Sequence, residues 1–350
     1  MLGLTAELTD RIDLDMSYVY GRSDSTVRQT NTRFNDRFLA AVDVITDPAT
    51  GQPTCRSNLQ PIGNSDQPYY NFFTGFSFGD FDQLSFTPGP NSGCIPFNLF
   101  SEQQAPGAID WLVTDAVDRS RIEQHVVSGS VSGDFGETLA LWGGPIGFAV
   151  GAEYRKERSE SNPDPVNTTG LTFGNALFPE TGQYSVKEVF GELRVPIAAN
   201  KPGFYDLSLN GAVRLSDYST VGTTTTWQVS GVYAPVPDVR FRGTYSQAVR
   251  APNIGELFGP QNQTFEFIDD PCAFDRLDNG TEFRAANCQT LLSGLGLTPA
   301  QIAAFDGDTG VSIAGTSGGN RNLREETAKT ITAGLVLRPS FLRGFSASVE

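Results

Sequence analysis

The sequence predicts an all-β chain that forms an antiparallel transmembrane β-barrel, here a partial meander of about nine strands. Apolar and polar residues alternate with period two along many segments, as in strands with one buried face. The long connections all fall on one side of the meander. The 37 Gly, 25 Phe and only 2 Met among 350 residues favour strands and turns. No apolar run of about 18 residues occurs, so a transmembrane helix is excluded.

The alternation is clearest between residues 204 and 217. We expect Leu207, Leu209, Val213 and Leu215 to face lipid and Asp206, Asn210 and Arg214 to face the lumen. A strand at 184–195 shows a slip in its apolar phase near Glu188. The full set of expected strands is about 12–21, 121–135, 146–158, 184–195, 204–217, 224–233, 239–248, 325–338 and 344 onward.

The connections between these strands sort by length. In chain order the first, third and seventh are long (22–120, 159–183 and 249–324), and every even one is short. Because alternate connections of an antiparallel meander lie on the same side, the long ones share a side. This is typical of an outer-membrane barrel, with short periplasmic turns and long outer loops. A soluble sandwich has no reason to sort its loops in this way.

Aromatic residues support the same orientation. Tyr205 and Tyr233 are expected near the short turns, and Tyr20, Tyr154 and Tyr245 near the long loops. Such rows are the girdles that mark the two lipid interfaces. The competing interpretation is that aromatic residues are simply common in strands.

Charge and cysteine content narrow the chemistry. The net charge of −15 argues against nucleic acid as a partner. With four cysteines, no Cys-x-x-Cys pair and one histidine, His125, a metal site is not expected. His125 is expected in the lumen or at the rim. Three cysteine pairings are possible, and sequence proximity favours Cys55–Cys94 and Cys272–Cys288, which would staple loops outside a reducing compartment.

Three segments resemble the TonB-dependent receptor family. Residues 245–258 contain Arg-Ala-Pro at the end of a strand, and residues 147–155 are similar to a barrel strand. Residues 319–327 are similar to the family's Gly-Asn-Pro-Asn-Leu-Lys-Pro-Glu box. Arg321 and Glu325 replace the prolines of the second box. The motif residues are Arg250, Ala251, Pro252, Asn253, Glu256, Leu257, Phe258, Gly319, Asn320, Asn322, Leu323 and Glu326.

The resemblance implies part of a receptor in the bacterial outer membrane that takes up a scarce nutrient of the siderophore, cobalamin or oligosaccharide class. Its partners would be outer-membrane lipid, the ligand and, through a plug, the TonB complex. It implies no cofactor and no catalysis. We expect residues 1–350 to be a partial barrel domain, without the plug and the C-terminal strands. Haem uptake is disfavoured because residues 259–318 contain no histidine.

Candidate ligand-binding residues lie in the two longest loops. The first loop combines aromatic and acidic residues, and the second begins with acidic ones. Such side chains can stack on planar ligands or accept hydroxyl groups. The alternative is a compact loop that buries its own aromatic residues. The candidates are Tyr69, Tyr70, Phe73, Asp80, Asp82, Glu266, Asp269 and Asp270.

Two other functions compete with import. One is a soluble, secreted carbohydrate-binding protein, which would need no detergent. The other is an outer-membrane serine hydrolase, because Ser77 and Ser317 lie in Gly-x-Ser-x-Gly segments. A nucleophile elbow requires a helix directly after the serine, and no helix signal follows either one.

Overall fold

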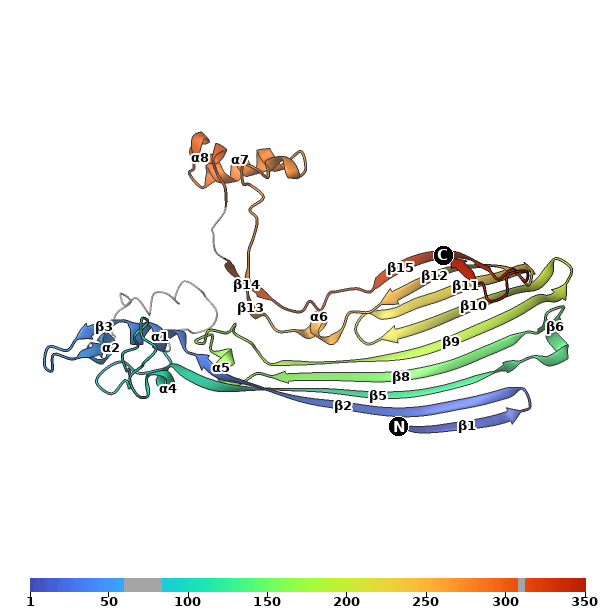
Figure 1. Ribbon diagram of the computed structural model, residues 1–350, viewed down its shortest axis with the longest axis horizontal. Helices are drawn as coiled ribbons and strands as arrows, with labels where there is room; N and C mark the ends of the chain where they lie inside the picture. The colour runs from blue at the N-terminus through green and yellow to red at the C-terminus, as the bar shows by residue number, and fades with distance from the viewer. Residues whose placement is uncertain (60–83, 308–311) are drawn as a thin grey trace.

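A computed structural model describes residues 1–59, 84–307 and 312–350, and its main feature is a ten-stranded antiparallel sheet (Figure 1). Each of the ten strands pairs with the next one along the chain, which makes a simple meander. Within the described residues, β1 and β16 do not pair with each other, so the sheet is open. The strands are β1 (Leu2–Thr9), β2 (Ile12–Arg33), β5 (Val113–Asp134), β8 (Gly147–Asn162), β9 (Glu180–Lys201), β10 (Phe204–Tyr218), β11 (Gly222–Val236), β12 (Val239–Arg250), β15 (Glu326–Leu337) and β16 (Ala347–Val349).

Smaller elements occupy the connections. The two-stranded pairs are β3 (Val44–Thr46) with β4 (Pro53–Cys55), β6 (Ala140–Leu141) with β7 (Gly144–Pro145), and β13 (Asn262–Glu266) with β14 (Ile313–Ser317). The helices are α1 (Asn35–Val42), α2 (Arg56–Leu59), α4 (Ala108–Leu112), α5 (Pro165–Thr168), α6 (Ile254–Phe258), α7 (Arg284–Gly294), α8 (Pro299–Ala303) and the 3-10 turns η1 (Gly136–Leu139) and η2 (Leu277–Asn279). None of the helices in the described ranges is long and apolar enough to cross a membrane.

All nine predicted strands exist, but the prediction was wrong in two respects. A tenth strand, β1, pairs with β2 through Leu4 opposite Met16. In addition, β2 and β5 contain 22 residues each, so the first long connection spans 34–112 rather than 22–120. Apart from Val27, the side chains of β2 beyond Gly21 are polar on both faces. No apolar period therefore marks them as a strand, and pairing with β5 holds them in place.

The long connections lie together at one end of the sheet, as predicted. In Figure 1 the connections β2–β5, β8–β9 and β12–β15 are at the left, and the turns after β1, β9 and β11 are at the right. Counting β1 shifts the number of every connection by one, but it does not change which connections share an end. We call the left end the long-loop side.

The two faces of the sheet differ in polarity and exposure. On β10, Leu209 and Val213 are 44% and 47% exposed on the outward face, whereas Ser208 and Ser216 are buried on the inward face. The inward face lines a hollow of about 780 Å³ whose walls include Ser132, Arg194 and Asn210. The sheet thus shows an apolar surface outward and a polar one inward.

Aromatic side chains form rows at both ends of the outward face. Near the short turns, the Phe204 and Tyr233 rings lie 5.8 Å apart, and the Tyr233 hydroxyl donates to the Gly203 carbonyl at 3.1 Å. On the long-loop side, the rings of Trp227 and Tyr245 meet edge to face at 4.9 Å. Tyr20 and Tyr154 occupy the same side on β2 and β8.

His125 belongs to the outward face and not to the lumen. Its Nδ1 lies 2.9 Å from the Tyr18 hydroxyl, and its ring centroid is 4.8 Å from that of Tyr20. The expectation of a lumen position was therefore wrong, and His125 lies within the strand ladder, between Tyr20 and Lys156. Its register opposite Tyr20 on β2 explains the outward direction.

Candidate functional site on the long-loop side

The first motif box ends β12 and folds into α6. Asn253 caps this helix, because its side chain accepts from the Glu256 amide at 2.8 Å. The Glu256 carboxylate in turn accepts from the Asn253 amide at 2.8 Å, which completes a capping box. Pro252 is buried directly before the cap and cannot donate to a neighbouring strand. The box therefore converts the end of a strand into a fixed turn of helix.

The second motif box lies against the first, although about 65 residues separate them. The Gly319 amide donates to the Gly259 carbonyl at 2.9 Å, and the Asn320 amide donates to the Glu256 carbonyl at 2.7 Å. A Cβ atom on Gly319 would lie 2.6 Å from the Gly259 nitrogen, so only glycine permits this approach.

Arg250 ties both boxes to the sheet. Its guanidinium donates to Glu326 of β15 at 3.0 Å and also pairs with Glu256 of α6. Arg321, which replaces a family proline, lies over the Phe258 ring with 5.3 Å from Cζ to the centroid. The substitution thus supplies a cation–π contact within the box. Of the other motif residues, Leu257 is buried, Leu323 is exposed and the Asn322 amide donates to the Asn320 side chain at 2.9 Å.

Electrostatics at this junction favour a charged carboxylate. The Asn253 amide and then the Arg250 guanidinium lower the pKa of Glu256 below its ordinary value of 4.5. A similar arrangement lowers the pKa of Asp164, whose carboxylate accepts from the backbone amides of Val117 and Val166. Both carboxylates are structural hydrogen-bond acceptors, so their positions are explained without a ligand.

The first long loop has its own small core around a disulfide. Cys55 and Cys94 are bonded to each other and pack with the buried Ala40, Ala41 and Leu112. Phe38, Phe86, Phe97, Trp111 and Val113 pack partly buried against this cluster. A loop that buries its own aromatic residues was one of the two interpretations of this segment. The candidates Tyr69, Tyr70, Phe73, Asp80 and Asp82 lie outside the described residues.

Hydrogen bonds of two adjacent residues, Asp36 and Arg37, hold the first long loop closed. Asp36 is fully buried and accepts from the Ser85 amide at 2.6 Å and from the Ser85 hydroxyl at 2.9 Å. Arg37 donates to the Ser85 carbonyl at 2.7 Å and to the Trp111 carbonyl at 3.1 Å. These contacts join the start of the loop to its end.

The second long loop carries a stapled helical lobe. Cys272 and Cys288 form the second of the two expected disulfides and pack with Leu292 of α7, and Ile302 of α8 packs against this cluster. Asp269 lies 2.8 Å from the Arg276 guanidinium, and Asp270 accepts from the Cys272 amide at 2.8 Å. Glu266 ends β13 and accepts from the Thr264 hydroxyl at 3.1 Å. Among the described residues, no group of three or more His, Cys, Asp or Glu side chains could hold a metal ion.

The connection between β8 and β9 fastens the two long loops to each other. Its Leu171 carbonyl accepts from the Asn35 amide of the first loop at 2.8 Å. On its other side, its Ala176 and Phe178 amides donate to the side chains of Gln263 and Asn262, at 3.0 and 2.8 Å. A cavity of about 120 Å³ lies at this junction, between Asp118, Phe178 and Asn262. Sequence reasoning missed Asn262 and Gln263, since an isolated amide side chain has no periodic signal.

The open meander, its outward apolar face and its one-sided loops define an outer-membrane β-barrel wall. The family model described as TonB dependent receptor-like, beta-barrel matches residues 3–349, so this chain belongs to that family. Its members are non-enzymatic transporters of the bacterial outer membrane. The outward face is therefore the lipid-facing one. Ser317 ends β14, and the segment directly after it is not helical, unlike that of a nucleophile elbow.

Three solved structures that are similar to this chain are two siderophore receptors and a ferric enterobactin receptor. The receptor PirA from Pseudomonas aeruginosa is 12% identical, with a TM-score of 0.41, and the match covers 99% of this chain and 43% of that one. The ferric enterobactin receptor PfeA mutant from the same organism is 10% identical at a TM-score of 0.41, with coverages of 99% and 40%. PirA from Acinetobacter baumannii is 13% identical at a TM-score of 0.39, with coverages of 65% and 29%. The chain thus spans less than half the length of these receptors.

Proposed function

We propose that this chain supplies barrel wall and outer loops to a receptor that imports a scarce nutrient of the siderophore, cobalamin or oligosaccharide class. The observation that carries the proposal is the fastening of three long connections to one another at one end of the wall. Loops joined in this way form a continuous surface above the lumen, and loops carried on a rigid scaffold are where binding residues concentrate.

Within that surface, Glu266 is the best-placed ligand contact among the described candidates. Asp269 and Asp270 already bond to Arg276 and to the Cys272 amide, so they hold the loop. Among the residues that the structure describes, the Glu266 carboxylate accepts from the Thr264 hydroxyl on its own strand. The candidates of the first loop, Tyr69, Tyr70, Phe73, Asp80 and Asp82, would add aromatic and acidic contacts. A plug domain and the TonB complex would couple binding to transport.

The test is uptake by cells that produce the full-length receptor containing this chain. Radiolabelled ferric siderophores, cobalamin and oligosaccharides are supplied separately, with and without TonB. We expect saturable uptake of one class and its loss when TonB is deleted. Glu266→Gln should weaken binding of that ligand, whereas Glu137→Gln, in the turn at the opposite end of the wall, should not. Uptake of none of the three classes, or uptake unaffected by TonB, would contradict the proposal.

A further inference from the structure

Six charged side chains form a regular array on the outward face of β2, β5 and β8. In the strand register, Arg22 lies opposite Glu123, and Glu123 lies opposite Arg158. One step further along, Asp24 lies opposite Arg121, and Arg121 lies opposite Glu160. Every charge therefore faces an opposite charge on the neighbouring strand. We call Arg22, Asp24, Arg121, Glu123, Arg158 and Glu160 the charged band.

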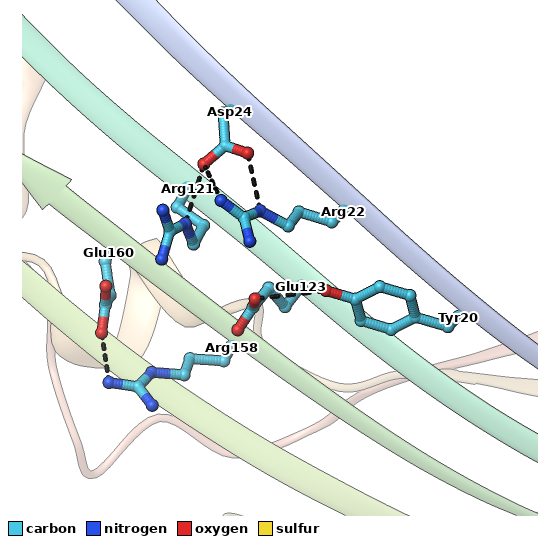
Figure 2. Close-up of polar contacts among 7 residues, drawn as sticks. All are labelled: Tyr20, Arg22, Asp24, Arg121, Glu123, Arg158 and Glu160. Atoms are coloured by element: carbon cyan, nitrogen blue, oxygen red, sulfur yellow. Dashed lines mark hydrogen bonds and ion pairs between the residues drawn. The ribbon is translucent and has the colours of Figure 1, made fainter.

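Ion pairs hold these side chains on the surface of the sheet (Figure 2). Asp24 accepts from Arg22 Nε at 2.6 Å and from Arg121 Nε at 2.8 Å, so one carboxylate joins two strands. Arg158 pairs with Glu160 on β8, and the Tyr20 hydroxyl donates to Glu123 at 3.3 Å. The Arg22, Arg121 and Arg158 side chains remain 41%, 44% and 49% exposed.

The position of the band matches a lipid headgroup layer. Arg22 follows Tyr20 of the aromatic row by two residues, and Arg158 follows Tyr154 by four. A strand rises about 3.3 Å per residue, so the band begins roughly 7 Å beyond the aromatic row. Headgroups occupy about 5–8 Å on each side of the hydrocarbon core. The band is therefore continuous with the lipid-facing surface and lies at headgroup depth.

The charge around the band is positive, although the chain carries −15. Lys156 lies on the same face with His125 and Ser185 opposite it, and Arg119 lies there with Thr26 and Asn162 opposite it. The charges of the three arginines and three carboxylates of the band cancel. Lys156 and Arg119 face neutral neighbours, so they give this part of the surface a net positive charge. Exposed ion pairs of this kind contribute about 0–1 kcal/mol each, so fold stability alone explains little of the arrangement.

We propose that the charged band is a docking surface for phosphate-bearing lipid headgroups of the leaflet on the long-loop side. A guanidinium has five N–H donors. The hydrogen bonds of Arg22 to Asp24 use two of its nitrogens, and that of Arg121 uses one, which leaves donors free. Guanidinium groups bind phosphate through paired hydrogen bonds. The carboxylates fix the guanidiniums at the strand spacing, and Lys156 and Arg119 add net positive charge.

The test uses the full-length receptor that contains this chain, purified in a neutral detergent. Mixed micelles supply dioleoyl phosphatidic acid or dioleoyl phosphatidylcholine, and native mass spectrometry counts the retained lipids. We expect preferential retention of phosphatidic acid, and a loss of about tenfold in its affinity in Arg121→Gln/Arg158→Gln. The matched control is Arg194→Gln, because Arg194 faces the lumen. Arg121→Lys/Arg158→Lys keeps the charge and should retain part of the preference.

Several outcomes would overturn the proposal. Equal retention of the two lipids by the unaltered receptor would do so without any variant, even if the glutamine variant fails to fold. If Arg194→Gln loses as much affinity for phosphatidic acid as Arg121→Gln/Arg158→Gln, the effect is not local to the band. Displacement of phosphatidic acid by free inorganic phosphate would indicate an anion site, and its displacement by an acidic peptide would indicate a protein partner. No arm measures uptake, so this result and that of the import test are separate.

Discussion

The strand wall and the long loops of this protein are stabilised by different partners. Wall residues such as Leu209 and Val213 remain more than 40% exposed, because the surface that covers them is lipid. The loops instead bury their own apolar side chains in two clusters, each built around a disulfide. The comparison implies that the wall depends on its environment and the loops on covalent staples.

The largest expected effect is on the loops. In the chain-entropy model, the Cys55–Cys94 bond, with a separation of 39 residues, contributes about 4 kcal/mol, and the Cys272–Cys288 bond, with a separation of 16, about 3 kcal/mol. Replacing either pair with serine in the full-length receptor should expose that loop to protease while the barrel keeps its resistance to heat in detergent. A barrel that melts together with the opened loop would show that the two regions are not independent.

The second effect breaks the wall alone. Leu209 lies on the lipid face between the two aromatic rows, and Asn210 lies on the lumen face beside it. Arginine at a mid-bilayer lipid position costs about 2–4 kcal/mol, and a lumen position tolerates it. Leu209→Arg should therefore reduce assembly into the outer membrane, measured as the heat-resistant fraction on gels, whereas Asn210→Arg should leave it unchanged. Equal damage from both would argue against the assignment of faces.

Period-two alternation predicted the wall because lipid imposes it, and the prediction weakened where lipid ends. On β9, Val189 and Leu193 are exposed on the lipid side, whereas nearer the long-loop side Val186 is buried inward and Lys187 points outward. The pairing of β8 with β9 runs without a shift through these residues, so the strand does not slip near Glu188. What changes along β9 is the face that carries the apolar side chains, which is the outward face at Val189 and the inward face at Val186. The inward Glu188 carboxylate accepts from the Ser216 hydroxyl at 2.6 Å, an interaction that alternation cannot reveal.

The loops were predictable only in their local features. Cysteine proximity favoured the two bonds that the structure contains, and the two boxes were recognisable as sequence. The contact between the two boxes could not be predicted from sequence, because it depends on Gly319 reaching Gly259 after a loop of some 60 residues has closed. The amide side chains that join the loops give no pattern at all. Long-range contacts of single polar residues are the part of this site that periodicity cannot supply.

A third, smaller effect tests how the loops attach to the wall. The side chains of α6 cover Gly182 of β9, where a Cβ atom would meet Ile254 and lie 2.9 Å from Phe258 Cδ2. Gly182→Ala should cost about 1–3 kcal/mol by overpacking and detach α6, which hydrogen exchange of residues 253–258 would report. Gly191→Ala on the same strand is the control, since its Cβ would have 4.0 Å to Val150. Similar exchange in both variants would mean that α6 does not depend on this contact.

The smallest effect concerns pH at the same junction. The Asn253 amide and Arg250 hold the pKa of Glu256 below 4.5, so the folded state binds this proton more weakly than the unfolded state. The stabilisation is therefore fully present above pH 4.5 and is lost as pH falls through the lowered pKa. Protection factors of the Asn253 and Leu257 amides, corrected for intrinsic exchange, should decrease in acid. Glu256→Gln can still accept from the Asn253 amide but cannot titrate, so its protection should not depend on pH in this range. If the glutamine variant loses protection in acid to the same extent, the acid sensitivity comes from the strand wall around α6, because the capping carboxylate would then be absent and the effect would remain.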